Sequence, residues 1–320
     1  MPISSRTANA VNATLLEWYG LHGRELPWRA TREPYHILMS EIMLQQTQVE
    51  RVVPAYHRFL SAFPTIQDLA AASRMEVIQA WQGLGYYRRA VRLHNLSKIV
   101  VIEMDGEIPH SYDELIKLPG IGQYTAAAVA CFAFNQQIPT IDVNVSRVLH
   151  RVHGKPRTSN SSSPNRAFYR LAKQSLPQGY AIQWNQALMD VGAIFCKNQA
   201  PSCDSCPLSK TCSTASVISQ SLSSKKKPPK APAIEQFHTP FKGSTRYFRG
   251  NIIRILSLLD AREKIAPEEL LDAINVEVNT DHKLDWRKFL DLLRTMAEEG
   301  LISEIQDQTT CELLALKLPS

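Results

Sequence analysis

The stretch that decides the fold is SYDELIKLPGIGQYTAAAVACFAFNQQIPTIDVNVSRVLHR, residues 111–151. Its polar first part predicts a helix that leads into LPGIG at 118–122, and its small-residue run predicts a second helix over about 123–134. A short apolar link then ends at Asp142, which opens a further helix. The first two helices, joined by so short a turn, form a hairpin.

The turn LPGIG has the composition of a phosphate-binding loop. Gly120 and Gly122 are expected to adopt backbone conformations that a side chain would block, and Pro119 fixes φ at the turn. Such a turn points successive N–H groups outward, where they can receive an anion. Tight helix–helix turns also occur in proteins that bind nothing, so the turn alone leaves both interpretations open.

Length and charge set the broad class of the protein. The chain has 320 residues, enough for two domains, a net charge of +6 and a pI of about 9.0. A basic balance suits a polyanionic partner, although many basic proteins bind none. No apolar run approaches the ~20 residues that span a bilayer, and the first twenty residues lack a signal peptide's apolar centre. We therefore expect a soluble, intracellular protein without a membrane partner.

A glutamate lies in an apolar helix early in the chain. Residues 35–47 are expected to form a helix in which Glu41 falls among Ile37, Leu38 and Leu44. Desolvation there would raise the pKa of Glu41 and favour the protonated acid. The alternative is a structural glutamate that is hydrogen-bonded to a neighbouring turn.

Asp142 precedes the apolar-periodic helix VNVSRVLHRV and has two interpretations. It is a natural N-cap, whose carboxylate accepts a hydrogen bond from the first turn. A helix N-terminus also favours the ionised carboxylate, which could stabilise a cationic transition state. The two roles can coexist.

The rest of the first two hundred residues is expected to be all-α. Helices are predicted over 7–21, 49–62, 65–72, 74–82, 165–175 and 184–195. The segment GLGYYRRA at 83–90 combines a glycine turn with paired tyrosines and arginines, which can wedge into DNA and grip phosphate. Its alternative is a helix start with a solvated face.

Four of the six cysteines lie close together, at the spacing C-x6-C-x2-C-x5-C: Cys196, Cys203, Cys206 and Cys212. Four thiolates this close predict a metal site, holding zinc or an iron–sulfur cluster. Zinc ribbons usually pair two C-x2-C knuckles, and this segment has one. Cys131 and Cys311 are isolated and are expected to be packing residues.

A second domain follows a linker. Residues 216–244 are rich in Ser, Lys and Pro, which predicts a basic, flexible linker. Residues 245–320 predict three helices, over 246–260, 267–275 and 285–299, and then strands over 301–305 and 311–318. This is a winged-helix-like α+β pattern, and such a domain binds DNA or a protein partner.

These pieces together resemble one enzyme family, from about residue 7 to 213. Glu41 in SEIMLQQTQV, LPGIGQYTAAAV at 118–129, Asp142 in TIDVNVSRVL and the four-cysteine loop are similar to the MutY-type adenine DNA glycosylases. The resemblance implies a two-lobed, all-α helix-hairpin-helix core over 1–215 with a 4Fe–4S cluster on the four cysteines. It also implies a monomer in the cytoplasm or nucleoid, acting on double-stranded DNA with a mismatched or oxidised base.

The resemblance assigns roles to individual residues. Glu41 would protonate adenine at N7, and Asp142 would stabilise the cationic sugar after the nucleotide has left the stack. The remaining matches are Tyr124 and Asn144 at the sugar and carboxylates, Gln186 at the adenine edge, Arg24, Trp28 and Leu44 in the pocket, Gln46, Thr47 and Tyr86 at the helix or opposite base, and Gly120 and Gly122 in the phosphate loop. Related lyases carry a Schiff-base lysine where Tyr124 stands, and no lysine occurs between Lys117 and Lys155, which predicts a monofunctional glycosylase.

Two departures from the family keep alternatives open. Val143 stands where the family usually has glycine, and thymine or uracil mismatch glycosylases of the same superfamily also vary there. Removal of thymine or uracil opposite guanine is therefore the alternative activity, although LQQTQV favours adenine. Residues 245–320 do not resemble the family's Nudix-like domain, which puts preference for 8-oxoguanine in doubt. A non-catalytic lesion-binding protein is a further alternative, disfavoured because both acids are present.

Overall fold

The computed structural model describes residues 5–154, 166–223, 242–259, 263–276, 283–306 and 313–319. The chain divides into two compact units, each assembled from two separate segments. The first comprises Met1–Glu41 and Pro109–Ala233, and the second Ile42–Ile108 and Ile234–Ser320. In the described part of the chain, no helix has the length and apolar character needed to cross a membrane.

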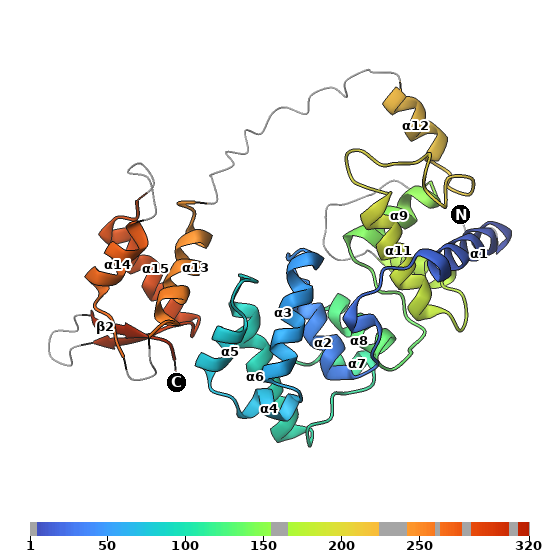
Figure 1. The fold of residues 1–320 in the computed structure, drawn as a ribbon. Helices are drawn as coiled ribbons and strands as arrows, with labels where there is room; N and C mark the ends of the chain where they lie inside the picture. Colours follow the sequence, from blue (N-terminus) through green and yellow to red (C-terminus); the bar gives the residue numbers. More distant parts are fainter. Residues whose placement is uncertain are drawn as a thin grey trace. The chain divides into compact units, whose positions relative to one another are not determined.

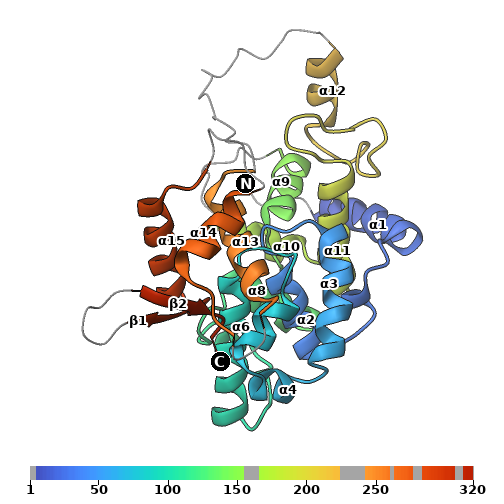
Figure 2. The same ribbon diagram turned by 60° about the vertical axis from the view of Figure 1, so that its left-hand side comes forward.

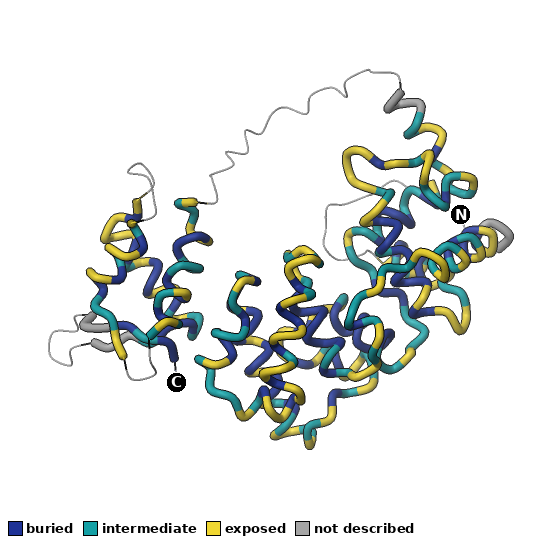
Figure 3. The backbone as a smooth tube through the Cα atoms, viewed as in Figure 1, coloured by how far each residue is buried: buried dark blue, intermediate teal, exposed yellow. Residues whose placement is uncertain are grey.

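The first unit is helical, as expected, and its core is built around α11 (Figure 1). Its elements are α1 (Ser5–His22), η1 (Pro27–Arg29), most of α2 (Pro34–Met43), α7 (Tyr112–Leu115), α8 (Gln123–Phe132), α9 (Val143–Val152), α10 (Arg166–Ser175), α11 (Ala181–Ile194) and α12 (Ala215–Ser223). Helices α1, α8 and α9 pack against α11. Buried positions recur along α9 and α11 as the dark blue stretches of Figure 3.

The pairing of α9 with α11 positions Asp142. Val145, Val148, Leu149 and Val152 recur at helical spacing on α9 and join the core with residues of α11. The helices approach closely at Gly192, where an added Cβ would lie 2.6 Å from the Cβ of Asn144. Glycine at this point of α11 therefore allows Asn144 to occupy its position next to Asp142.

The hairpin predicted at 118–122 is present, with two differences in detail. Gly120 has a φ of 83°, the left-handed conformation that favours glycine, and the amide of Ile121 donates to the carbonyl of Leu118. Gly122 is an extended N-cap with a φ of −90°, and a Cβ there would meet open space. The expectation that Gly122 needs a conformation closed to other residues is therefore wrong. The helix before the turn, α7, spans only Tyr112–Leu115.

The first segment of the second unit consists of α3 (Val49–Ala62), α4 (Ile66–Ala71), α5 (Arg74–Ala80) and α6 (Arg88–Glu103). Helices α4 and α5 both pack on α6 and begin with reciprocal capping boxes, Thr65 with Asp68 and Ser73 with Glu76. The sequence pattern predicted no helix over 88–103, where α6 lies, because the GLGYYRRA segment at 83–90 overlaps the start of this helix. It also extended the helix containing Glu41 to Thr47, whereas α2 ends at Met43.

The C-terminal region contains α13 (Thr245–Leu256), α14 (Pro267–Asn275), α15 (Trp286–Glu298), β1 (Ser303–Gln306) and β2 (Leu313–Lys317). The strands pair antiparallel, and Ile265, between α13 and α14, forms an additional bridge with Leu316 (Figure 2). Helices α14 and α15 both pack on α13. Of the expected linker, 216–223 is helical in α12, while 224–241 lies outside the described residues, as does Cys311.

Candidate active site

Glu41 has the environment that its position on an apolar stripe predicts. It lies on α2 with 5% of its surface exposed. Burial raises its pKa to about 7, with a contribution from the negative charge of Asp142, while a hydrogen bond from the Tyr124 hydroxyl and the charge of Arg29 oppose the rise. Near neutral pH a substantial fraction of Glu41 therefore carries a proton that it can donate.

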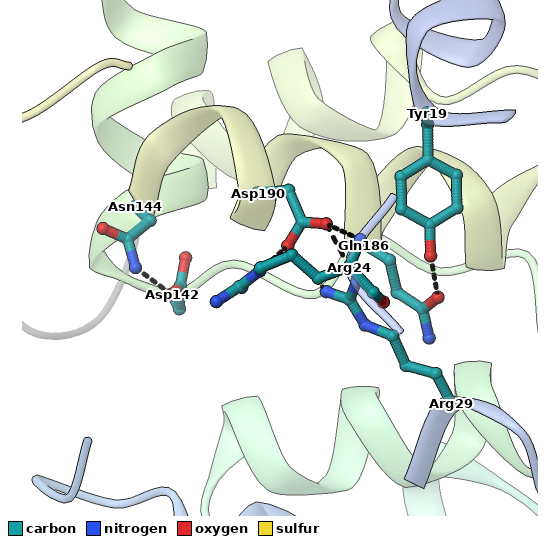
Figure 4. Close-up of polar contacts among 7 residues, drawn as sticks. All are labelled: Tyr19, Arg24, Arg29, Asp142, Asn144, Gln186 and Asp190. Atoms are coloured by element: carbon teal, nitrogen blue, oxygen red, sulfur yellow. Dashed lines mark hydrogen bonds and ion pairs between the residues drawn. The ribbon is translucent and has the colours of Figure 1, made fainter. Parts of the chain in front are cut away.

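Asp142 is the N-cap of α9 and faces the same site. One carboxylate oxygen accepts a hydrogen bond from the amide of Val145 at 2.6 Å and the other from the Asn144 side chain at 3.0 Å (Figure 4). Burial raises the pKa of Asp142, and these hydrogen bonds oppose the rise. Because more donors stabilise the Asp142 carboxylate than the Glu41 carboxylate, Glu41 holds a proton more readily and the negative charge stays on Asp142.

Asn144 is held in one orientation by Arg147, a residue that sequence analysis did not select. Arg147 donates to the Asn144 side-chain oxygen at 2.7 Å and to the carbonyls of Gly192 at 2.8 Å and Cys196 at 2.5 Å. A guanidinium has only donors, so the oxygen of Asn144 must face Arg147 and its amide nitrogen must face Asp142. The predicted grouping of Glu41, Tyr124, Asp142 and Asn144 is thus present.

A second polar group in the first unit surrounds Asp190 of α11, whose side chain is fully buried (Figure 4). Its two oxygens accept from the backbone and side chain of Arg24, at 3.0 and 2.7 Å, and from both terminal nitrogens of Arg29, at 2.9 and 2.8 Å. Burial would raise the pKa of Asp190, but these hydrogen bonds hold that pKa below its usual value. The carboxylate therefore stays ionised and fixes both arginines.

Gln186 lies one helical turn before Asp190 and belongs to the same group. It is 7% exposed, and its side-chain oxygen accepts from the Tyr19 hydroxyl at 2.6 Å. The guanidinium of Arg29 lies 5.8 Å from the centre of the Tyr19 ring. Trp28, which precedes Arg29 in η1, is buried.

Sequence analysis selected Arg24, Trp28 and Gln186 but missed Tyr19, Arg29 and Asp190. Asp190 lies among buried apolar residues of α11, which is the signal that revealed Glu41. The same test applied to α11 would have found it.

Comparison with known proteins reveals the family. A model described as "HhH-GPD superfamily base excision DNA repair protein" matches residues 39–174. The solved structure of a thermostable thymine-DNA glycosylase is similar with a TM-score of 0.62 and 31% identity, covering 66% of this chain and 98% of that one. The chain belongs to the HhH-GPD superfamily. An endonuclease III structure at 24% identity, with a TM-score of 0.59, shares the fold.

Curated members of the superfamily are also similar in sequence. The adenine DNA glycosylase of Buchnera aphidicola is 40% identical over 200 residues, which cover 62% of this chain and 56% of that protein. The human adenine DNA glycosylase is 40% identical over 220 residues, covering 66% of this chain and 40% of that protein. The matched region thus spans about half, or less, of these relatives.

Helix α8, the second helix of the hairpin, begins without a side-chain cap because its N-cap residue is Gly122. Gly120 and Gly122 are both exposed. The amides of the first turn of α8 therefore lack a capping side chain and are available to an anion.

In the second unit, Arg89 joins the segment after α2 to the loop before α6. It is 7% exposed and donates to the carbonyls of Met43 at 2.7 Å, Gln45 at 2.6 Å and Gly85 at 3.1 Å, and to the Thr47 hydroxyl at 3.0 Å. Burial lowers the pKa of Arg89 to about 10, so it remains charged at neutral pH.

Two exposed residues in the segments that Arg89 joins have strained backbone conformations. Gln46 has a φ of 55° and Tyr86 a φ of 47°, conformations that are costly for residues other than glycine. Both side chains are exposed, while Leu44 and Thr47 are partly buried. Arg89 thus joins the two segments that carry Gln46, Thr47 and Tyr86.

The four cysteines Cys196, Cys203, Cys206 and Cys212 line one cavity with mainly apolar neighbours. Within the described ranges they are free thiols, and no three His, Cys, Asp or Glu side chains converge on a point suited to one metal ion. Arg151 lies 3.3 Å from the sulfur of Cys196. Four sulfur donors around one cavity are the ligands that zinc and iron–sulfur clusters both use in proteins.

The raised pKa of Glu41 leads to a stability prediction. Between about pH 4.5 and about pH 7, Glu41 is protonated in the folded protein and ionised in the unfolded one, so folding takes up a proton there. Below this window the neutral Glu41 costs no stability, whereas above it the folded protein must bury a charged Glu41 and is less stable. Glu41→Gln should therefore raise the free energy of unfolding by about 1–3 kcal/mol at about pH 8 and leave it nearly unchanged at about pH 4.5. Thermal unfolding of both proteins at the two pH values is the measurement, and an equal difference at both would contradict the shift.

Proposed function

We propose that this protein removes adenine mispaired with guanine or 8-oxoguanine from double-stranded DNA by hydrolysing the N-glycosidic bond. The observation that carries the proposal is the pairing of a buried, protonatable Glu41 with a hydrogen-bonded Asp142 carboxylate. Its similarity to adenine DNA glycosylases over about 200 residues supports adenine as the base.

The proposed mechanism uses the two carboxyls in different protonation states. The target nucleotide leaves the base stack, because the glycosidic bond cannot be reached inside the duplex. Glu41 donates its proton to adenine N7, which makes the base a better leaving group. As the bond breaks, positive charge develops on the sugar, and the Asp142 carboxylate stabilises it. Tyr124 keeps Glu41 oriented through its hydroxyl.

The proposed reaction ends with water as the nucleophile. Tyr124 occupies the position where related lyases place a lysine, and the sequence has none between Lys117 and Lys155. Without an amine to form a Schiff base, the sugar–phosphate backbone should remain intact after base removal.

Removal of thymine or uracil opposite guanine is the second candidate. The similarity to the thymine-DNA glycosylase structure, over 98% of its length, favours it, as does Val143. Thymine and uracil have no N7, so they would not use the proton-donor site that Glu41 offers a purine. A single-turnover panel of A, T, U and hypoxanthine, each opposite G and 8-oxoguanine, separates the candidates. Release of thymine or uracil but not adenine would refute our proposal.

Each unit offers its own candidate DNA contacts. The uncapped first turn of α8 would accept a backbone phosphate at Gly120 and Gly122. Gln46 and Tyr86, which are exposed and have strained backbone conformations, would enter the helix or contact the opposite base. Arg89 binds the carbonyls of Gln45 and Gly85, the residues that directly precede them.

We assign a 4Fe–4S cluster to Cys196, Cys203, Cys206 and Cys212, with a structural and DNA-positioning role. The lining of one cavity by all four thiols supports it. Purified protein should be brown, with broad absorbance near ~400 nm and about four irons per chain. A protein prepared without air that contains one zinc and no iron would overturn the assignment.

We propose that residues 245–320 form a winged-helix-like domain with a DNA or protein partner. The order of three helices and a hairpin, with Ile265 bridged to Leu316, supports this. It would not inspect 8-oxoguanine.

A fragment of residues 1–223 tests this separation. It retains both acids, the hairpin and α12, and two residues of α12, Ala215 and Ile218, line the cysteine cavity. It should excise adenine within about tenfold of the full rate, and bind every duplex more weakly with a shallower salt slope, because four lysines of 225–230 are lost. Loss of activity opposite 8-oxoguanine alone would show that the C-terminal domain inspects the lesion.

A further inference from the structure

The buried side chain of Arg89, in α6, donates hydrogen bonds to two separate segments of the second unit. In the first segment the acceptors are the carbonyls of Ile42 at 2.9 Å, Met43 at 2.7 Å and Gln45 at 2.6 Å, and the Thr47 hydroxyl at 3.0 Å. In the second segment they are the carbonyls of Leu84 at 3.4 Å, Gly85 at 3.1 Å and Tyr86 at 3.4 Å. The bonds to Ile42 and Met43 take up carbonyls at the end of α2, but the other bonds go to loops and serve no helix end.

Only a guanidinium can serve both segments at once. Arg89 donates from Nε, Nη1 and Nη2, whose N–H groups form a rigid planar fork. In the part of the chain that the structure describes Arg89 forms no ion pair, so bonds to neutral oxygens must offset the cost of burying its charge. A lysine keeps the charge but presents its donors from a single point, so it would reach one segment and leave the other.

Gln46 is a strained residue with an Arg89 hydrogen bond on each side of it. Its φ of 55° lies in the left-handed region, which is costly for a residue with a side chain. Arg89 binds the carbonyl of Gln45 before it and the hydroxyl of Thr47 after it. The direction of the Gln45 carbonyl sets the peptide plane that leads into Gln46, and so restricts its φ. Besides Arg89, the described residues offer this carbonyl only the Thr47 hydroxyl, at 3.3 Å.

Tyr86, the strained residue of the other segment, is also held by Arg89. Its φ is 47°. The Arg89 side chain binds the carbonyl of Gly85 before it, and the Arg89 backbone amide donates to the carbonyl of Tyr86 itself at 2.9 Å. The guanidinium carbon also lies 5.5 Å from the centre of the Tyr86 ring. The Trp81 indole shares the Gly85 carbonyl at 3.2 Å, so Tyr86 depends less on Arg89 than Gln46 does.

Both strained residues are exposed, while the arginine that binds their neighbours is buried. A strained conformation persists only where its surroundings enforce it. We propose that Arg89 is a positioning residue that enforces the left-handed conformations of Gln46 and Tyr86, and so presents both side chains to DNA in one fixed arrangement. The proposal rests on the proposed function, in which these two residues enter the helix or contact the opposite base.

Thermal unfolding of Gln46→Gly and Gln46→Ala tests the enforced conformation without DNA. Both variants lack the glutamine side chain, and they differ chiefly in how readily they adopt positive φ. With Arg89 present, Gln46→Gly should unfold about 2–4 °C above Gln46→Ala, because glycine takes up the enforced conformation without strain. In the Arg89→Lys background the loop can relax, so this difference should disappear or reverse. A difference that is equally large in Arg89→Lys would overturn the proposal.

Binding to two duplexes tests the consequence for DNA. One duplex has adenine opposite guanine, with a fluorine at C2′ of the target sugar to disfavour the cationic transition state and so slow cleavage. The other has the same adenine opposite thymine. Arg89→Lys should lower the preference for the mismatch about tenfold, the value of one misplaced hydrogen bond. Affinity for the matched duplex and its salt slope should stay unchanged, because the charge is kept. An unchanged mismatch preference would also overturn the proposal.

Arg92→Lys is the matched control, because it makes the same change at an exposed position one turn later in α6, and it should match the native protein in both experiments. If Arg89→Lys does not fold, Thr47→Val decides in its place, since it keeps the side-chain shape and removes one acceptor of Arg89. There a reduced difference between Gln46→Gly and Gln46→Ala supports the proposal, and an unchanged one overturns it. If the native protein shows no preference for the mismatch, the proposed function fails separately, and the unfolding comparison still decides the role of Arg89.

Discussion

Replacing Glu41 with glutamine should reduce the single-turnover rate of adenine excision at least ~100-fold, the lower range for a positioned general acid. Glutamine keeps the size of the side chain and its capacity to bind the Tyr124 hydroxyl, but it has no acidic proton to give to N7. Binding of mismatched DNA should survive. The measurement is release of adenine from a duplex with enzyme in excess.

Glu33→Gln is the matched control for this variant, because it makes the same chemical change at an exposed position directly before α2. It should leave the rate unchanged. An excision rate within a few-fold of native for Glu41→Gln would remove Glu41 from the mechanism.

Replacing Asp142 with asparagine should cost a similar factor, at least ~100-fold in rate, because the sugar cation would lose its facing anion. Asparagine is as good an N-cap as aspartate and can still accept from the amide of Val145, but its own NH₂ group would then face that of Asn144, so stability should fall by about 1 kcal/mol. Asp142→Ala should lose the cap as well, at about 1 kcal/mol of stability. The rates and the unfolding midpoints of both variants separate the catalytic role from the structural one. If Asp142→Asn were destabilised but kept the native excision rate, Asp142 would have a structural role and no catalytic one.

The two catalytic carboxyls could be predicted because each depends on local sequence rules. Glu41 was found from helix periodicity, which placed it among apolar residues, and it is 5% exposed. Asp142 was found from its place before an apolar-periodic run, and it caps α9. Both inferences use the residues within one or two helical turns, where spacing in sequence determines spacing in the structure.

The partners of these residues could not be predicted in the same way. Arg29 and Asp190 are 161 residues apart, and Tyr19 and Gln186 are 167 apart, so only the packing of α1 and η1 against α11 brings them together. The sequence offers 36 basic residues and no rule for which of them a buried aspartate will choose. Arg89 belongs to a basic pair in the sequence, but its structural role depends on carbonyls at the end of α2 and in the loop before α6.

The predicted end of the helix that carries Glu41 was wrong because a tertiary contact determines where that helix ends. The apolar pattern continues through Leu44, yet α2 stops at Met43, where Arg89 takes up the carbonyls of Ile42 and Met43. For the four-cysteine loop, the residues could be predicted but the group that they bind could not. Its spacing selected the residues that line one cavity, but spacing does not identify the group that they hold.

The central claim is that Glu41 delivers a proton while Asp142 remains an anion, and the pH dependence of single-turnover adenine excision tests it most directly. The rate constant should fall above about pH 7, by about tenfold per pH unit, because only the protonated form of Glu41 is active and burial raises its pKa to about 7. The residual activity of Glu41→Gln should lack this inflection. A native rate constant that stays level from about pH 6 to about pH 9, or an inflection that persists in Glu41→Gln, would contradict the account.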